Sequence, residues 1–362
     1  MERRSGRVKH QAKELLREAY ARLLFHTGLH ALVNRLMPRR LTILLGHCLE
    51  ASGVNEGLPA DMKISPGKLG ELLEWLRRRY EFGTVTASYL ALQDGDMGRS
   101  LVALTMDDGY RDNATHLLPF LAARQLPATI YLESRPLDER RANWSHLFFW
   151  LVKREGVELV ARRYLTASED AVALEGLRRC LEEGEAKLLY RVKRVLKYDA
   201  DPDDRERVLA ALLEESGGDV EGLTSELYMT WEQARELRDA GWELGGHTIS
   251  HPVLSRLSRE EAAHEIVEGE RSLERELGLV STSFAYPFGR PWDYNEDSVE
   301  AVRASEFQLA VTTTSGVNRP DTDPLLLKRI AIGEESKLHL IAAEACGGFE
   351  LLRRFGIDLS PA

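Results

Sequence analysis

The amino-acid sequence predicts an α/β fold, a (β/α) barrel of about seven strands that carries a helical insertion. Short apolar segments rich in leucine, isoleucine and valine alternate with longer amphipathic segments of helical period. This alternation is typical of βα units around a parallel sheet or barrel. No Gly-x-Gly-x-x-Gly dinucleotide fingerprint accompanies these units, which favours a barrel over an open nucleotide-binding sheet.

The first half of the predicted barrel contains three strands and two helices. Ser65 is a typical helix N-cap and Pro66 a typical first helical residue, so a helix is expected to begin there. Its apolar face repeats at helical spacing, with Leu69, Leu72, Leu73 and Leu76. The strands are predicted at 41–45, 101–105 and 127–132, and a second helix at 112–124.

Residues from about 140 to 225 interrupt this alternation. They are highly charged, helical in pattern and nearly without strand signals, which predicts a helical insertion between two barrel units. Capping boxes at Thr230–Gln233 and Ser258–Glu261 then begin two more helices. The remaining elements are strands at 242–246, 283–286, 307–313 and 326–332 and a helix at 294–305. The barrel domain is therefore predicted at 41–335, followed by a C-terminal helix within 336–362.

Composition narrows the classes of partner and compartment. The 362-residue chain has a formal net charge of −10 and no basic stripe beyond its N-terminus, which argues against a nucleic-acid partner. Its three scattered cysteines do not form a disulfide framework, so a reducing compartment is expected. No secretory signal is evident, and we expect the protein to be cytoplasmic. Nothing in the sequence indicates an oligomeric state.

The N-terminal segment, residues 1–40, is predicted to be amphipathic and helical. Leucines recur at helical spacing among lysines and arginines over residues 12–37. A helix packed on the domain surface is favoured. A peripheral contact with the inner face of the membrane is the alternative, because basic amphipathic helices also bind membrane surfaces.

Two pairs of polar residues follow predicted strands and carry the chemistry. Asp107 and Asp108 end an apolar strand, and His247 and His251 follow another. One carboxylate and two imidazoles can hold zinc or a similar divalent metal and leave a coordination position open for water. If Asp108 binds the metal, Asp107 is free to act as a general base. Pro252 disfavours helical backbone at His251, so a tight turn is expected to close the spacing between the histidines.

Three motifs resemble those of the polysaccharide deacetylases, the NodB-homology or carbohydrate esterase family 4 enzymes. Thr105–Gly109 reads Thr-Met-Asp-Asp-Gly, similar to the family's Thr-Phe-Asp-Asp-Gly. His247–His251 resembles its His-Ser/Thr-x-x-His motif, and Phe284–Gly289 its Arg-x-Pro-Tyr-Gly motif. The resemblance covers roughly residues 41–132 and 226–332 and implies a distorted (β/α) barrel.

The resemblance also implies roles for residues of this chain. Asp107 would be the base, and Asp108, His247 and His251 would hold a divalent metal, expected to be Zn²⁺. The third motif would place Tyr286, Pro287 and Phe288 along the substrate groove, with the Phe288 N–H helping to hold an oxyanion. Arg329 is expected to hold Asp107 ionised or to orient it, and Arg290 is a second candidate for that contact.

The general acid is where the chain departs from the family. The late Leu-x-His motif is missing, and the last predicted strand reads Leu-Leu-Leu-Lys-Arg-Ile-Ala-Ile. However, strand 41–45 leads to His47 at the other end of the chain, as in circularly permuted members. We expect that strand to fill the slot of the missing one, with His47 as general acid; a structural histidine is the alternative.

The implied reaction is the hydrolytic deacetylation of a sugar or polysaccharide, most often at the N-acetyl group of a GlcNAc-type unit. The expected partner is therefore an acetylated glycan or a glycan precursor. Two alternatives remain open from the sequence. One is hydrolysis of a non-sugar amide on the same fold, and the other is a non-catalytic carbohydrate-binding barrel, against which the presence of both aspartates and both histidines argues.

Overall fold

A computed structural model describes residues 2–50, 55, 58–95 and 98–359, and the side chains among them from residue 12 onward. Its centre is a parallel sheet in the order β10-β1-β5-β6-β7-β8-β9, with β4 beside the start of β5. The strands of this sheet are β1 (Leu41–Gly46), β4 (Glu81–Phe82), β5 (Leu101–Met106), β6 (Thr129–Leu132), β7 (Glu243–Gly246), β8 (Ser283–Ala285), β9 (Leu309–Val311) and β10 (Ile330–Ala331).

The sheet is curled, so that the last barrel segment of the chain, residues 327–331, contacts both β9 and β1. Leu327 exchanges backbone hydrogen bonds with β9 and its neighbour Thr312. Three residues later, Ile330 and Ala331 of β10 pair with Leu44 and Leu45 of β1. The seven strands on this path confirm the predicted α/β class and the distorted barrel. The expected strand at 326–332 is interrupted because it passes from one neighbour to the other.

Strand β1 lies directly beside β5, in register from Leu41 opposite Leu101 to Gly46 opposite Met106. All six residues of each strand are buried, as expected of central parallel strands covered on both faces. The strand before His47 therefore ends level with the strand before Asp107. A two-stranded sheet of β2 (Cys48–Leu49) and β3 (Lys63–Ile64) continues from that end.

Helices cover the barrel at the predicted positions and at two that were not predicted, residues 85–94 and 134–139. Ser65 caps α3 and accepts a hydrogen bond from the Lys68 N–H, and both predicted capping boxes are formed. The expected helix at 112–124 begins instead with a π-helical turn over residues 113–117. These helices are α3 (Pro66–Arg77), α4 (Val85–Asp94), α5 (Leu118–Ala122), α6 (Ser134–Glu139), α13 (Trp231–Asp239), α14 (Arg259–Leu277) and α15 (Glu296–Ala304).

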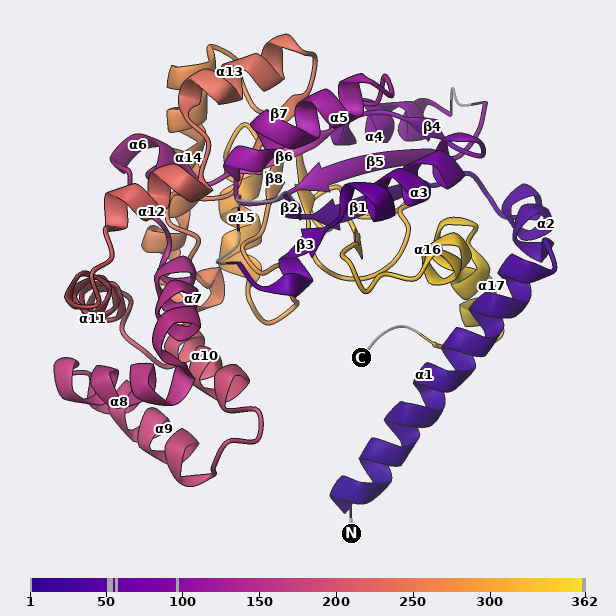
Figure 1. Cartoon of the computed structure of the whole chain (residues 1–362). Helices are drawn as coiled ribbons and strands as arrows, with labels where there is room; N and C mark the ends of the chain where they lie inside the picture. The colour runs from indigo at the N-terminus through magenta and orange to yellow at the C-terminus, as the bar shows by residue number, and fades with distance from the viewer. Residues whose placement is uncertain (1, 51–54, 56–57, 96–97, 360–362) are drawn as a thin grey trace.

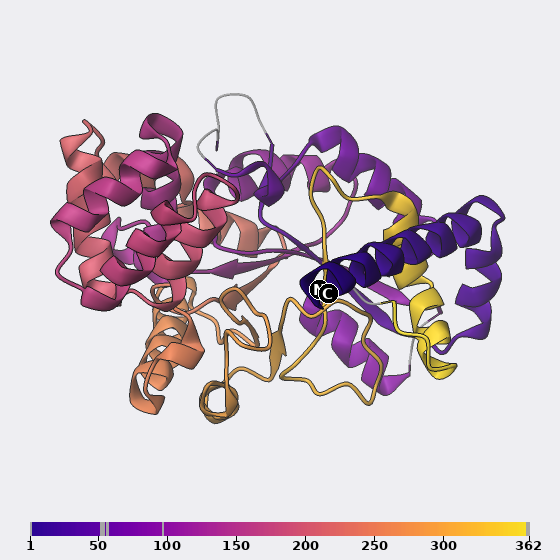
Figure 2. The ribbon, with the colours of Figure 1, turned by 90° about the horizontal axis from the view of Figure 1, so that it is seen from below.

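The helical insertion packs around a core of its own. Its apolar centre gathers large side chains such as Trp144, Phe148, Tyr164 and Leu209, all nearly inaccessible to solvent. The helices are α7 (Trp144–Glu155), α8 (Val157–Ala167), α9 (Ala171–Glu182), α10 (Leu188–Tyr198), α11 (Pro202–Glu215) and α12 (Val220–Leu227). Figures 1 and 2 show them at one end of the molecule, opposite the terminal helices.

The terminal helices form a separate small cluster. Side chains of α1 (Glu2–His26) and α2 (Leu29–Leu36) pack against α16 (Leu338–Ala345) and α17 (Gly348–Arg354). The single C-terminal helix expected within 336–362 is corrected to two, broken at Gly347 with φ 78°, a left-handed conformation that glycine favours. Residues 360–362 lie outside the described residues.

The N-terminal helices are only half covered. Ala21, Leu24 and Val33 are buried against the C-terminal helices. Large apolar side chains remain exposed on the other faces, namely Leu15, Leu16, Leu23, Leu29, Leu32 and Leu36. Among the described residues, no helix has the length and apolar content that a transmembrane segment needs.

Candidate active site

The predicted site residues meet at the carboxyl ends of the barrel strands. β5 ends at Met106 and delivers Asp107 and Asp108, while β7 ends at Gly246 and delivers His247. Backbone hydrogen bonds extend the strands into these residues, since the Asp107 N–H donates to Gly46 and the His247 N–H to Leu132. Parallel strands bring such residues to one edge of a barrel, where active sites form.

Asp108, His247 and His251 form one compact, buried group. Ligand atoms of the three side chains all lie within 4.8 Å of one another. The Nε2 atoms of His247 and His251 lie 3.3 Å and 3.6 Å from Asp108 Oδ1. The sequence-predicted ligand set is thus brought together. The group supplies two nitrogens and one oxygen, a donor set that suits zinc with an open position.

Hydrogen bonding around these ligands fits a cation between them. His247 Nδ1 lies 2.6 Å from the Ala285 carbonyl oxygen and donates to it, which turns Nε2 toward Asp108. Asp108 Oδ1 and His251 Nδ1 are buried without a hydrogen-bond partner in the described part of the chain. An unpaired carboxylate oxygen facing imidazole nitrogens needs a positive charge beside it.

The pKa shifts of the two histidines also indicate that a positive charge is favoured beside Asp108. Burial lowers the pKa of His251 to about 3, so its ring is neutral, as a metal ligand must be. Burial alone would lower the pKa of His247 too, but the nearby carboxylates of Asp108 and Asp107 outweigh it and raise that pKa. The carboxylates therefore attract either a proton or a cation to this position.

Asp107 is held by Arg329 and stays apart from the ligand group. Arg329 Nη1 and Nη2 donate to Asp107 Oδ1 and Oδ2 at 2.7 Å and 2.8 Å, a bidentate pair. Arg329 also donates to the Thr105 hydroxyl and the Thr312 carbonyl, which fix its orientation. Burial raises the pKa of Asp107, but Arg329 more than offsets burial and lowers it. Asp107 is therefore an ionised carboxylate at neutral pH.

Arg329 comes from a different strand than the third motif of the resembling family implies. Ala285 stands where the third motif carries its arginine, and its carbonyl oxygen accepts from His247. Arg329, from the segment next to β10, supplies the guanidinium instead. Arg290, the other candidate for this contact, lies in the cavity wall and makes no ion pair with Asp107.

A carboxylate from α14 shapes the turn between the two histidines. Glu265 Oε2 accepts from the Ile249 and Ser250 N–H groups, both at 2.9 Å, and Oε1 accepts from the Ser250 hydroxyl at 2.6 Å. The segment is non-helical, as Pro252 predicts, and His251 has φ 57°. Sequence reasoning missed Glu265, because nothing marks it out within an acidic helix.

Backbone strain is concentrated in the three motifs. Of the eight non-glycine residues with positive φ in the described chain, four lie there: Asp108, Thr248, His251 and Phe288. Gly109, with φ 73°, has no room for a side chain, because a Cβ would lie 2.8 Å from a Leu132 methyl carbon. Such conformations cost about 1–3 kcal/mol each and persist where the surroundings enforce them, often at functional sites.

His47 faces the same cavity as both aspartates. Asn113 donates to the His47 carbonyl at 3.0 Å, and the buried Asp112 accepts from the Leu49 N–H and from Asn55 Nδ2, both at 2.6 Å. These contacts hold the chain beyond β1 against the π-helical turn. The sequence signal for them was weak: two polar residues that are separated from the first motif by Tyr110 and Arg111 and precede an apolar helix.

The cavity over these residues has a volume of about 380 Å³. Phe288 lines it, with its ring 4.5 Å from that of His251. Tyr286 does not line the cavity, and this part of the prediction is corrected: its ring is buried and stacks on Tyr294. Side-chain alternation explains this, because Ala285, the last residue of β8, and Tyr286 point to opposite faces and pack in different apolar clusters. Pro287 is buried and does not line the cavity either.

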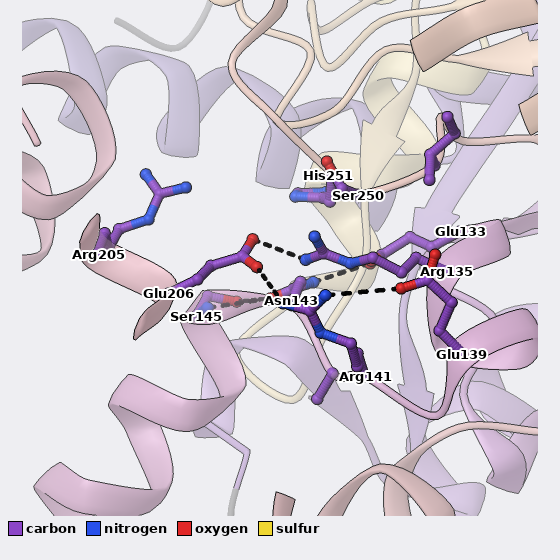
Figure 3. A network of polar contacts seen from close by, with 12 residues as sticks. Glu133, Arg135, Glu139, Arg141, Asn143, Ser145, Arg205, Glu206, Ser250 and His251 are labelled. Carbon is purple, nitrogen blue, oxygen red and sulfur yellow. Dashed lines mark hydrogen bonds and ion pairs between the residues drawn. The ribbon is translucent and has the colours of Figure 1, made fainter. Parts of the chain in front are cut away.

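A polar network ties the insertion to the barrel beside His251 (Figure 3). Glu206 of α11 binds Arg135 of α6 at 2.7 Å and Arg141 at 3.3 Å. Asn143 caps α7 and donates to Glu133, which follows β6, at 2.8 Å. The insertion is thereby fixed against the edge of the barrel that carries the site.

Comparisons with known proteins agree with this site. The polysaccharide deacetylase family model matches residues 94–184 and 196–310, more than half of the chain. YxkH of Bacillus subtilis (strain 168), which is named as a polysaccharide deacetylase, is 28% identical over 105 residues. That match covers 29% of this chain and only 37% of YxkH.

Solved structures share the fold at low sequence identity. The deacetylase PplD of Streptococcus pyogenes, in complex with acetate, superposes with a TM-score of 0.56 at 18% identity, over 85% of this chain and 99% of that one. IcaB from Ammonifex degensii gives 0.52 at 20% identity, over 86% and 98%. With the family model matched over all three motif-bearing strands, the chain belongs to the polysaccharide deacetylase family.

Proposed function

We propose that this protein is a metal-dependent hydrolase that removes the acetyl group from an acetylated sugar, with the N-acetyl group of a GlcNAc-type unit as the preferred target. One observation carries the proposal: three buried ligand side chains converge, and Asp107 stands beside them, ionised on Arg329. A resident divalent cation, expected to be Zn²⁺, would acidify a water molecule and polarise the acetyl carbonyl.

The chain's own residues handle the protons. Asp107 takes the proton of the attacking water, because Arg329 occupies one side of each carboxylate oxygen and leaves its other lone pairs free. Water oxygen adds to the acetyl carbon, the carbon–nitrogen bond then breaks, and acetate leaves. The departing amine requires a proton, which we assign to His47 in the same cavity.

Phe288 is assigned to the developing oxyanion. Its backbone N–H makes no hydrogen bond to any other described residue, and its φ of 59° is held by the tight turn at Gly289. A donor that is already free and oriented stabilises negative charge without reorganisation. The barrel wall beneath it is rigid, since the Thr313 N–H donates to the Gly289 carbonyl and the Thr313 hydroxyl to that of Phe288.

Acetate release tests this function. The full-length protein should release acetate from GlcNAc oligomers, lose that activity with a chelator and regain it with added Zn²⁺. Asp107→Asn should bind metal without turnover, whereas the exposed Asp94→Asn should behave as wild type. Ring-opening hydrolysis of cyclic amides, without acetate release from any acetylated glycan, would contradict the proposed substrate.

We also propose that the protein acts in the cytoplasm, at the inner face of the membrane. Support comes from the leucines exposed along α1 and α2, Leu16 and Leu36 among them, and from the basic residues of that segment. The three cysteines are free thiols. Sedimentation with anionic vesicles should carry the protein down, and Leu16→Glu combined with Leu36→Glu should release it; equal sedimentation of both would contradict the membrane contact.

A further inference from the structure

One face of α10 presents cationic side chains to the active-site cavity. Tyr190, Lys193, Arg194 and Lys197 recur at intervals of three and four residues, so they share one helix face, and all four line the cavity. The opposite face is apolar and buried in the core of the insertion, through Leu188, Val192, Val195 and Leu196. The insertion thus supplies a wall of the site that the barrel motifs do not encode.

A second hollow of about 520 Å³ adjoins this cavity. Four residues line both hollows, so the two are continuous: Tyr190, Arg194, Tyr198 and Arg290. Ser255, Arg256 and Trp292 complete the lining of the second hollow. Three of its seven lining residues are arginines, and none is a carboxylate.

The positive charge of this hollow is largely uncompensated. Within the described residues, Arg194 and Arg290 have no carboxylate within ion-pair distance, and Arg256 approaches only Asp199, at 4.0 Å. The nearby Asp293 is fully buried and engaged elsewhere, since it pairs with Lys197 at 2.9 Å and accepts from the Tyr198 hydroxyl at 2.7 Å. A chain with net charge −10 therefore concentrates free guanidinium groups beside its active site.

We propose that the second hollow binds a phosphate group carried by the substrate, so that the protein deacetylates a phosphate- or diphosphate-linked sugar. This inference rests on the proposed function. Guanidinium groups bind phosphate oxygens through paired N–H donors, and three of them suit a group of two or more negative charges better than a single carboxylate. The acetylated sugar occupies the cavity above Asp108, and its phosphate extends past Arg194 and Arg290.

The border between the hollows is built to position such a substrate. Lys197 Nζ lies 3.5 Å from the centre of the Phe288 ring and is anchored by Asp293. The Trp292 indole N–H donates to the Tyr198 hydroxyl at 3.0 Å, and Trp292 is 58% exposed. The contacts of Trp292, Tyr198 and Lys197 thus connect the second hollow to Phe288, whose N–H we assign to the oxyanion.

Selectivity between matched substrates tests the inference. Three probes carry the same acetylated sugar: chitotriose, UDP-N-acetylglucosamine and polyprenyl-diphosphate-linked N-acetylglucosamine. The wild-type protein should show a kcat/KM for at least one diphosphate substrate about tenfold or more above that for chitotriose. Added salt should raise KM for the diphosphate substrate only, because it screens the arginines. The preferred diphosphate substrate then identifies the carrier as nucleotide or lipid.

Arg194→Gln and Arg290→Gln should each lower this selectivity ratio about tenfold. Arg179→Gln, an exposed arginine on α9 of the same insertion, is the matched control and should leave the ratio unchanged. A ratio near one in the wild type, or a high ratio that survives both substitutions, would overturn the inference.

A binding measurement separates failure of the subsite from failure of the proposed function. Calorimetry with pyrophosphate should show binding to the wild type that weakens about tenfold in Arg194→Gln. If no substrate is deacetylated but this difference remains, the deacetylase function fails and the phosphate site stands. If acetate is released while pyrophosphate binds wild type and Arg194→Gln equally, the phosphate site fails and the function stands.

Discussion

Replacing Arg329 with glutamine should destabilise the protein and impair its base together. Arg329 is fully buried, and its side chain makes four hydrogen bonds, two of them to Asp107. Removing one partner of a buried ion pair leaves the other charge unpaired and costs about 3–5 kcal/mol. We expect a loss of that size in the free energy of unfolding of Arg329→Gln at neutral pH, measured by urea denaturation.

The loss should depend on pH in a defined direction. Arg329 lowers the pKa of Asp107 below its usual 3.8, so the stabilisation is present above that pH and lost as the pH falls through the folded-state pKa. In Arg329→Gln, the strongest influence that opposes burial is lost, so the pKa of Asp107 rises. The gap in unfolding free energy between wild type and variant should therefore narrow as the pH falls. The acid limb of kcat/KM should also move to higher pH in the variant.

Two further variants make this reasoning refutable. Adding Asp107→Asn to Arg329→Gln removes the unpaired charge and should recover part of the lost stability, without activity. Arg162→Gln breaks an exposed pair with Glu158 and should change stability by about 1 kcal/mol or less. An Arg329→Gln protein as stable as wild type at neutral pH, with an unmoved acid limb, would refute the account of Asp107.

Three other changes have defined outcomes. His47→Ala should lower kcat about 10²–10⁴-fold while zinc content stays at the wild-type level, and retained turnover would remove His47 as the acid. Glu265→Gln weakens the acceptor that shapes the turn between the histidines, so zinc affinity should fall about 10–100-fold. Competition with a chromogenic chelator measures this affinity. An unchanged affinity would show that the turn does not depend on Glu265. Burial raises the pKa of Asp112 to about 6, above the unfolded value of 3.8. The folded state therefore holds this proton more tightly, and the resulting stabilisation is present at low pH and lost as the pH rises through about 6. The stability advantage of wild type over Asp112→Asn should thus shrink by about 2.4 kcal/mol from pH 4 to pH 7, and a constant difference would contradict this shift.

The barrel and its four central site residues were predictable because each depends on local pattern. Apolar strands that end in Asp107-Asp108 and in His247 place both motifs at one edge of a parallel sheet, whatever the loops do. The capping boxes at Thr230 and Ser258 likewise mark helix starts within a few residues of sequence. Such features require no knowledge of distant contacts.

What the sequence left open depends on contacts between distant residues. Glu265 and Arg194 resemble ordinary charged residues on helices until the fold turns them toward the site. Tyr286 was misplaced because the motif gives its neighbours but not which face each side chain takes. The single C-terminal helix was wrong because the break at Gly347 serves packing against Arg40, a residue more than 300 positions earlier.

The central claim is that Asp108, His247 and His251 bind one cation while Asp107 remains on Arg329. A crystal structure of the protein with Zn²⁺, with the ion located by anomalous scattering, tests it most directly. The account predicts a single ion about 2.0–2.2 Å from Asp108 and from one ring nitrogen of each histidine, with Asp107 still paired to Arg329. An ion bound elsewhere, or bound by Asp107 in place of Asp108, would contradict it.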